Sequence, residues 1–145
     1  MKFWKSFSKK AVLRQLFFVL TLFTILIPIA IWDSNTQVKV TFDSTELYID
    51  SDKYSMAVPY DIISSTELVT LPEAGEKVAD GFDDDIIRTG VWTNSVWGEY
   101  YIVADLDVSN CIVLHLNDER IFVFSCKNEE KTAEYFNTLQ TYLAP

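Results

Sequence analysis

An uninterrupted apolar run near the start of the chain constrains its architecture more than any other feature. Residues 16–32 read LFFVLTLFTILIPIAIW, seventeen residues without a formal charge and with Thr21 and Thr24 as the only hydroxyl-bearing ones. At the helical rise of about 1.5 Å per residue the run spans roughly 26 Å, close to the ~30 Å hydrocarbon core of a bilayer. We therefore predict a transmembrane anchor over residues 15–32. Its apolar residues are Leu16, Phe17, Phe18, Val19, Leu20, Leu22, Phe23, Ile25, Leu26, Ile27, Pro28, Ile29, Ala30, Ile31 and Trp32.

The charges on the two sides of this run differ in sign. Residues 1–32 carry five basic and no acidic residues, a charge of +5. Residues 33–145 carry seven basic and all 21 acidic residues, a charge of −14. Because Lys and Arg beside a membrane span stay on the cytoplasmic side, we expect a basic cytoplasmic segment at 1–14. The domain that follows the anchor is then extracytoplasmic, and the chain belongs to the cell membrane as a single-pass protein.

A cleavable signal peptide would share the basic start and the apolar core. Such peptides end in small residues of the A-x-A kind, whereas this run ends in Ile-Ala-Ile-Trp. A cut after Ala30 would put Pro28 where a small residue is required. Trp32 instead suits the aromatic belt at the outer interface of a bilayer. The residues favour an uncleaved anchor over a signal peptide or a buried soluble helix.

The residues that follow the anchor have the pattern of one strand-rich domain. A polar spacer at 33–37 is followed by apolar–polar alternation with period two, the pattern of half-buried strands separated by short polar turns. Asn128 can cap a closing helix, whose apolar stripe of Ala133, Phe136, Leu139 and Leu143 would face the sheet. The predicted domain is 38–145, mainly β or α+β, with about seven antiparallel strands in a bent sheet or barrel. The predicted strand segments are 38–42, 46–49, 54–58, 62–69, 90–92, 98–103, 112–116 and 120–124.

The middle of the domain, residues 70–89, is rich in glycine, proline and acidic residues and predicts a long surface connection. Asp83, Asp84 and Asp85 invite a calcium interpretation, because Ca²⁺ takes several carboxylate oxygens. They lack the alternating spacing of a calcium loop and its closing Glu, which favours a solvated loop. Next to this connection, Trp92, Trp97, Tyr100 and Tyr101 crowd one predicted hairpin, where aromatic packing across strands is favoured over a binding platform.

The order of these elements resembles a known family. The residues that carry the resemblance are Leu47-Tyr48-Ile49, Val58-Pro59-Tyr60-Asp61-Ile62, Glu67-Leu68, Leu71-Pro72, Gly81, Thr89-Gly90, Gly98 and Lys131-Thr132. Over about residues 38–143 the layout resembles the bacterial pleckstrin-homology-like (PH-like) family, which includes membrane-anchored members. The resemblance implies a strongly bent, seven-stranded antiparallel sheet plugged by a C-terminal helix. It implies a scaffold and no particular activity, since one fold serves many functions.

Charge excludes several partners. A domain at −14 repels anionic lipid and nucleic acid, so we expect neither as a ligand. The turns Asp43-Ser44 and Asp50-Ser51-Asp52 are acidic where phosphate recognition needs Lys and Arg, so no phosphoinositide is expected either. A protein or a cell-envelope component is the expected partner.

No pattern in the sequence indicates catalysis, a metal or a cofactor. His115 is the single histidine and lies in an apolar strand, and the chain has no Gly-x-Ser-x-Gly elbow or glycine-rich phosphate loop. One histidine and two cysteines match no common zinc site. We therefore predict no catalytic, cofactor-binding or metal-binding residues and a non-catalytic binding module. A small-ligand sensor that uses a sheet–helix groove and an enzyme of unrecognised type are the alternatives.

Cys111 and Cys126 raise the question of a disulfide. If the last hairpin turns symmetrically about Asp118-Glu119, the two cysteines face each other, and a non-hydrogen-bonded pair can approach disulfide geometry. A four-residue loop would give this closer pair, and a two-residue loop the wider one. An extracytoplasmic domain permits oxidation. Two buried free thiols are the alternative, and the sequence leaves both open.

Overall fold

The computed structural model describes residues 15, 17–19, 21, 24 and 38–144, and the chain divides into two compact units, Met1–Asn35 and Thr36–Pro145. In the first unit the described residues are helical, and the Thr21 hydroxyl donates to the Phe17 carbonyl at 2.7 Å. The rest of the predicted anchor, the basic segment 1–14 and the spacer 33–37 lie outside the described residues. Within the described part, every helix falls short of the length and apolarity that a membrane crossing requires.

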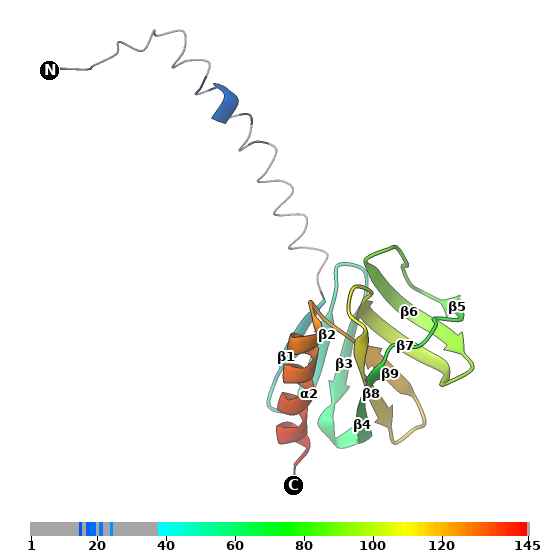
Figure 1. Cartoon of the computed structure of the whole chain (residues 1–145). Helices are drawn as coiled ribbons and strands as arrows, with labels where there is room; N and C mark the ends of the chain where they lie inside the picture. Colours follow the sequence, from blue (N-terminus) through cyan, green and yellow to red (C-terminus); the bar gives the residue numbers. More distant parts are fainter. Residues whose placement is uncertain (1–14, 16, 20, 22–23, 25–37, 145) are drawn as a thin grey trace, which may run out of the picture. The chain divides into compact units, whose positions relative to one another are not determined.

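The second unit contains nine strands, a short 3₁₀ helix and one long helix (Figure 1). These are β1 (Lys39–Phe42), β2 (Glu46–Asp50), β3 (Ser55–Pro59), η1 (Tyr60–Ile62), β4 (Ile63–Thr70), β5 (Glu76–Ala79), β6 (Ile87–Asn94), β7 (Gly98–Asp105), β8 (Asn110–Leu116), β9 (Ile121–Phe124) and α2 (Glu129–Leu143). The prediction of a mainly-β domain with a C-terminal helix is confirmed.

The strands form two sheets, one of three strands in the order β1-β2-β3 and one of six in the order β4-β8-β9-β7-β6-β5. All neighbouring pairs are antiparallel except β7 and β9, which run parallel. The buried Ser125 extends this parallel pair, since its hydroxyl donates to the Asp105 carbonyl at 2.9 Å and accepts from the Asp105 amide at 3.0 Å. Nine strands in two sheets correct the expected seven in a single bent sheet or barrel.

The main core fills the space between the two sheets and α2. Leu47, Ile49 and Val58 of the small sheet are fully buried against Ile112 and Leu114 of β8. Successive residues on a strand point to opposite faces, so the small sheet buries one face and leaves the other in solvent. This one-sided burial explains the clean apolar–polar alternation of 39–59.

The large sheet is buried on both faces in its centre. A second cluster contains Trp92, Tyr100 and Val113 on the face opposite the main core. The connection between β4 and β5 lies beside this cluster, because the Tyr100 hydroxyl donates to the Ala74 carbonyl at 2.7 Å. Trp97 meets Tyr100 edge to face with ring centroids 5.1 Å apart. The aromatic hairpin is therefore packed, as predicted.

The predicted surface connection 70–89 contains a strand, β5, and overlaps the first residues of β6, which begins at Ile87. Just after β5, two glycines allow the chain to approach the backbone of β6 closely. A Cβ on Gly90 would lie 1.6 Å from the Asp80 carbonyl oxygen, and one on Gly81 would lie 2.1 Å from that of Thr89. The glycines read as loop signals in the sequence and instead mark this close backbone approach.

Candidate binding grooves

Helix α2 packs on β8 and contacts an edge strand of each sheet. Leu139, fully buried, faces the core in the middle of the helix. On one flank of α2 the Tyr135 ring lies 5.7 Å from that of Phe42 in β1. On the other flank the Gln140 amide donates to the Thr66 hydroxyl in β4. The helix thus lies between two strand edges, β1 and β4, and a groove accompanies each.

The start of α2 is held by two polar side chains. Asn128 caps the helix by accepting from the Lys131 amide at 2.8 Å, as the sequence predicted. Thr132 is buried, and its hydroxyl accepts from the Cys126 amide at 3.2 Å and donates to the Cys126 carbonyl at 3.1 Å. These bonds fix the first turn of α2 against the end of β9. The sequence analysis named Thr132 only among the residues that carry the family resemblance and gave it no structural role.

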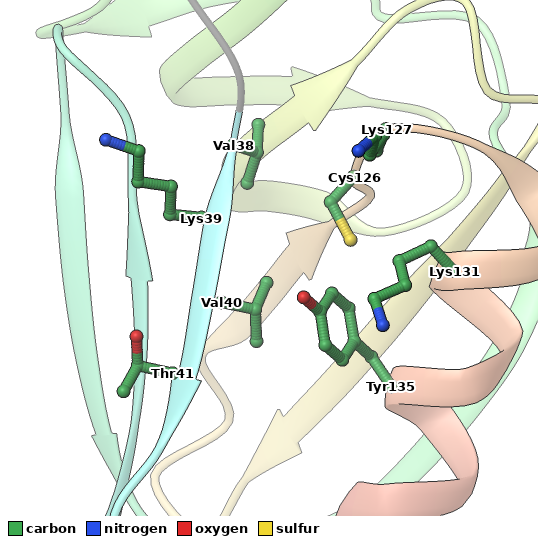
Figure 2. A pocket seen from close by; sticks show the side chains of 8 residues that line it. All are labelled: Val38, Lys39, Val40, Thr41, Cys126, Lys127, Lys131 and Tyr135. Atoms are coloured by element: carbon green, nitrogen blue, oxygen red, sulfur yellow. The ribbon is translucent and has the colours of Figure 1, made fainter. Parts of the chain in front are cut away.

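The first groove, which we call the β1 groove, has a volume of about 400 Å³ (Figure 2). One wall is the edge of the small sheet and the other is the first turns of α2 with the residues before it. The β1 groove is lined by Val38, Lys39, Val40, Thr41, Cys126, Lys127, Lys131 and Tyr135. Figure 2 shows the valine side chains on the helix side of β1 and those of Lys39 and Thr41 on the opposite side.

The backbone of β1 has unpaired groups along this groove. Among the described strands, β1 lies at an edge and pairs with β2 alone. The Asp43 amide donates to the Glu46 carbonyl at 3.0 Å, which makes these two residues a hydrogen-bonded pair. Because such pairs alternate along an antiparallel ladder, the amides and carbonyls of Val40 and Phe42 point away from β2. The β1 groove therefore offers backbone donors and acceptors as well as side chains.

Three of the seven basic residues after residue 32 line the β1 groove, and none of its lining residues is acidic, although the domain as a whole is acidic. Lys131 is paired with Glu134 at 2.8 Å and lies 5.1 Å from the centre of the Tyr135 ring. The hydrogen bond to Glu134 raises the pKa of Lys131, so this ammonium stays charged at neutral pH. Lys39 and Lys127 form no ion pair among the residues described.

The second groove, which we call the β4 groove, has a volume of about 540 Å³ and lies beside the other end of α2. Its lining is mostly polar and uncharged. It consists of Tyr60, Asp61, Ile63, Ser64, Ser65, Thr66, Gln140, Tyr142 and Leu143. The rings of Tyr60 and Tyr142 stack at 5.1 Å, and burial raises the pKa of Tyr60 to about 12. Its hydroxyl therefore stays protonated and donates to the Asp43 carbonyl at 3.0 Å.

His115 lines neither groove, although it is paired in register with Ser65 of the β4 groove. Its Nε2 lies 3.4 Å from Glu67 Oε1 without hydrogen-bond alignment, and it has no hydrogen-bond partner in the described residues. The Ser64 hydroxyl donates to the backbone carbonyl of His115 at 2.8 Å and so is not directed at the ring. Across the described ranges, no three His, Cys, Asp or Glu side chains gather as metal ligands.

The acidic triplet is a hydrogen-bonded loop. Asp84 accepts from the amides of Ile87 at 2.7 Å and Ile86 at 2.8 Å, and these bonds lower the pKa of its carboxyl group. Asp83 pairs with Arg88 at 2.9 Å. These carboxylates are engaged in structural contacts of the loop before β6.

Of the two possibilities that the sequence left open for Cys111 and Cys126, the structure has two free thiols, because the last hairpin is shifted by one residue from a symmetric turn about Asp118-Glu119. The Leu116 amide donates to the Arg120 carbonyl at 2.9 Å, which closes a three-residue loop at 117–119 with Glu119 in a left-handed conformation at φ 69°. A shift of one residue puts the cysteines on opposite faces of the sheet. Cys111 belongs to the second cluster and Cys126 to the main core, and both are free thiols.

Neither groove corresponds to residues that the sequence singled out for function. Their walls come from the first strand, the last helix and the η1–β4 segment, which meet only in the fold. No family model, curated protein or solved structure matches the chain in the comparisons. The grooves themselves are therefore the basis for any functional proposal.

Proposed function

We propose that this protein is a non-catalytic binding module, held at the cell membrane by a single N-terminal anchor with its domain outside the cytoplasm. Its partner is a protein or another component of the cell envelope. The charge asymmetry about the apolar run supports this orientation. The net charge of −14 after residue 32 argues against anionic lipid, phosphoinositide and nucleic acid as partners.

The observation that carries the proposal is the pair of grooves beside α2. Each has an edge strand on one side and side chains of α2 on the other. The two cysteine thiols, in contrast, are unsuited to act as nucleophiles. Burial raises the pKa of Cys111 to about 12 and that of Cys126 to about 11, so neither thiol is a thiolate at neutral pH. These features support recognition more than catalysis.

We further propose that the domain is a divergent PH-like domain. A C-terminal helix packed on curved sheets supports this assignment, as does the meander β1-β2-β3 that opens the domain. The six-stranded second sheet and the parallel β7–β9 pair depart from a seven-stranded antiparallel layout. The functional proposal rests on the grooves and does not depend on this assignment.

Crosslinking in intact cells tests the function. A photo-crosslinking amino acid placed at Thr41 or at Ser65 would report contacts at the β1 and β4 grooves respectively, in the full-length chain. We expect a specific adduct from at least one position. An exposed position far from both grooves, Val96, serves as the control and should give none. Absence of adducts at both grooves would refute the proposed binding function.

A small-ligand sensor is the second candidate, and the β4 groove favours it. Its hydroxyl, amide and carboxylate groups beside two stacked tyrosines suit a small polar ligand. Ligand binding to the native state raises stability by mass action, about 2.7 kcal/mol at one hundred times Kd. Thermal melting of the full chain against a panel of small polar metabolites tests this candidate, and Thr66→Ala should abolish any shift that comes from the groove.

A further inference from the structure

We propose that the β1 groove binds an extended, acidic segment of a partner protein as an added strand on β1. This inference rests on the proposed binding function and assigns it a site and a partner chemistry. Strand addition at an exposed edge combines backbone hydrogen bonds, which give affinity, with pockets for alternate side chains, which give specificity. The β1 groove offers both.

The shape of the groove supports an extended occupant. Three consecutive residues of β1 and Val38, which precedes the strand, line it, although their side chains point alternately to opposite faces. A groove lined by all four must therefore run along the backbone edge of β1. At about 3.3 Å per residue this edge is roughly 13 Å long, which suits a short strand better than a compact ligand.

The hydrogen-bonding pattern supports the same occupant. Val40 and Phe42 direct their amides and carbonyls away from β2, and Val40 is among the residues that line the groove. Natural proteins protect exposed edges with very short strands, charged side chains or bulges, and the edge strand β5 of the large sheet is protected in this way. β5 is four residues long, carries Lys77 and has an irregular register at that residue. β1 is equally short but borders a groove.

The side chains of the groove define what the added strand must carry. Residues of the partner that point toward the core side would meet Val40, Tyr135 and Cys126, which are apolar or neutral. Residues that point to the other side would meet Lys39, as Figure 2 indicates. Lys127 is exposed and unpaired in the described part of the chain. An alternation of small apolar and acidic residues satisfies both faces.

Local acids limit the strength of this charge attraction. Lys131 is already neutralised by Glu134, and Glu129 and Glu130 follow Lys127 directly. The two available ammonium groups are exposed, so each contributes modestly and remains sensitive to salt. We therefore infer that backbone pairing supplies most of the affinity and that the lysines select an acidic sequence.

The test uses the full-length chain in its own membrane. A photo-crosslinking amino acid is placed at Thr41, with a matched control at Val78 in the edge strand β5. Mass spectrometry identifies the peptide joined to each position. The proposal predicts an adduct at position 41 with a protein segment in which acidic and apolar residues alternate. An adduct with lipid, with a second copy of this chain or with a non-acidic segment would overturn it.

Two sets of variants separate backbone pairing from charge. Val40→Pro removes an amide that points into the groove, and proline is tolerated at an edge when its missing donor faces outward. We expect it to abolish the adduct at position 41, whereas Val78→Pro should leave that adduct unchanged. The double variant Lys39→Glu/Lys127→Glu should reduce the adduct about fivefold or more, and Lys53→Glu/Lys77→Glu should not.

Folding and function are controlled separately. Thermal melting of each purified full-length variant in detergent shows whether it is folded. If Val40→Pro does not fold, the charge variants still test the site. An adduct that survives both groove variants overturns strand addition. Adducts at Ser65 without any at Thr41 would do the same while leaving the binding function intact. Absence of adducts at both Thr41 and Ser65 would contradict the proposed binding function as well.

Discussion

Thr132 and Cys126 are joined by two hydrogen bonds, so that one buried hydroxyl serves both the amide and the carbonyl of the same residue. The pair connects the end of β9 to the first turn of α2. It therefore sets the position of the helix wall that the β1 groove depends on.

Replacing this hydroxyl should destabilise the domain. Thr132→Val keeps the shape of the side chain but leaves the Cys126 amide without its partner, which costs about 1–3 kcal/mol in unfolding free energy. Thr138→Val is the matched control, because its hydroxyl donates to the Glu134 carbonyl on the exposed side of α2. That control should lie within about 0.5 kcal/mol of the wild type. Urea denaturation measures both, and equal effects would contradict the role given to Thr132.

Two glycines with positive φ should respond very differently to alanine. A Cβ on Gly90 would lie 1.6 Å from the Asp80 carbonyl oxygen at a φ of 103°, so Gly90→Ala must push the segment after β5 away from β6. We expect a loss of at least about 3 kcal/mol. Gly98 has a φ of 69° and nothing within 4 Å of an added Cβ. Gly98→Ala should cost only about 1–2 kcal/mol, from backbone conformation alone.

The two thiols should be free and unreactive in the native protein. Burial raises the pKa of Cys111 to about 12 and that of Cys126 to about 11, from a usual 9.0. At pH 8 we expect no alkylation of the folded chain and two alkylated cysteines per chain after denaturation without reductant. Mass spectrometry of both samples gives the count. A single intramolecular disulfide in the denatured sample would contradict the register of the last hairpin.

The same pKa shifts predict a loss of stability in alkali. The unfolded thiols ionise from about pH 9, whereas the folded ones stay protonated until about pH 11 or 12. The contribution of the two thiols to the free energy of unfolding is therefore fully present below pH 9. It falls as pH rises toward 11, by up to about 1.4 kcal/mol per pH unit for each thiol. The double variant Cys111→Ala/Cys126→Ala should show a shallower fall between pH 9 and 11 in denaturant titrations. An unchanged slope would assign the effect to the buried tyrosines instead.

The proposed topology predicts the outcome of proteolysis on spheroplasts. External proteinase K should digest the domain and leave a small, membrane-protected N-terminal fragment, because the basic segment stays inside. A cytoplasmic protein that stays intact and a periplasm-exposed one that is digested are the controls. Full protection of residues 33–145 would reverse the orientation, and a mature N-terminus at Ile31 or Asp33 would replace the anchor with a signal peptide.

Much of the first half of the domain could be predicted because its signals are local. The segments of β1 to β4 follow from period-two alternation bounded by polar turns, and their predicted ends agree with the structure to within about one residue. The cap at Asn128 is equally local, since a side chain and an amide three residues apart suffice for it. Short-range patterns of this kind are visible without knowledge of the fold.

The remainder depends on contacts between distant residues. Gly81 and Gly90 have the sequence pattern of loop residues, yet their lack of side chains is what permits the segment after β5 to lie against β6. The register of β8 and β9 depends on Glu119, a residue that adopts a left-handed conformation in place of the expected glycine or asparagine. The grooves combine β1 with α2 and β4 with α2, which no pattern along the chain joins.

The position of β9 has a consequence for how the domain is made. β9 lies between β8 and β7 in the large sheet, although it is the last strand to be synthesised. Until residues 121–124 have been synthesised, β7 and β8 each have an unpaired edge facing the same gap. The sheet is completed only when this last strand enters it, so assembly of the domain is coupled to the end of its synthesis. A chain that stalls before residue 121 would present two unpaired apolar edges and be a natural substrate for quality-control proteases.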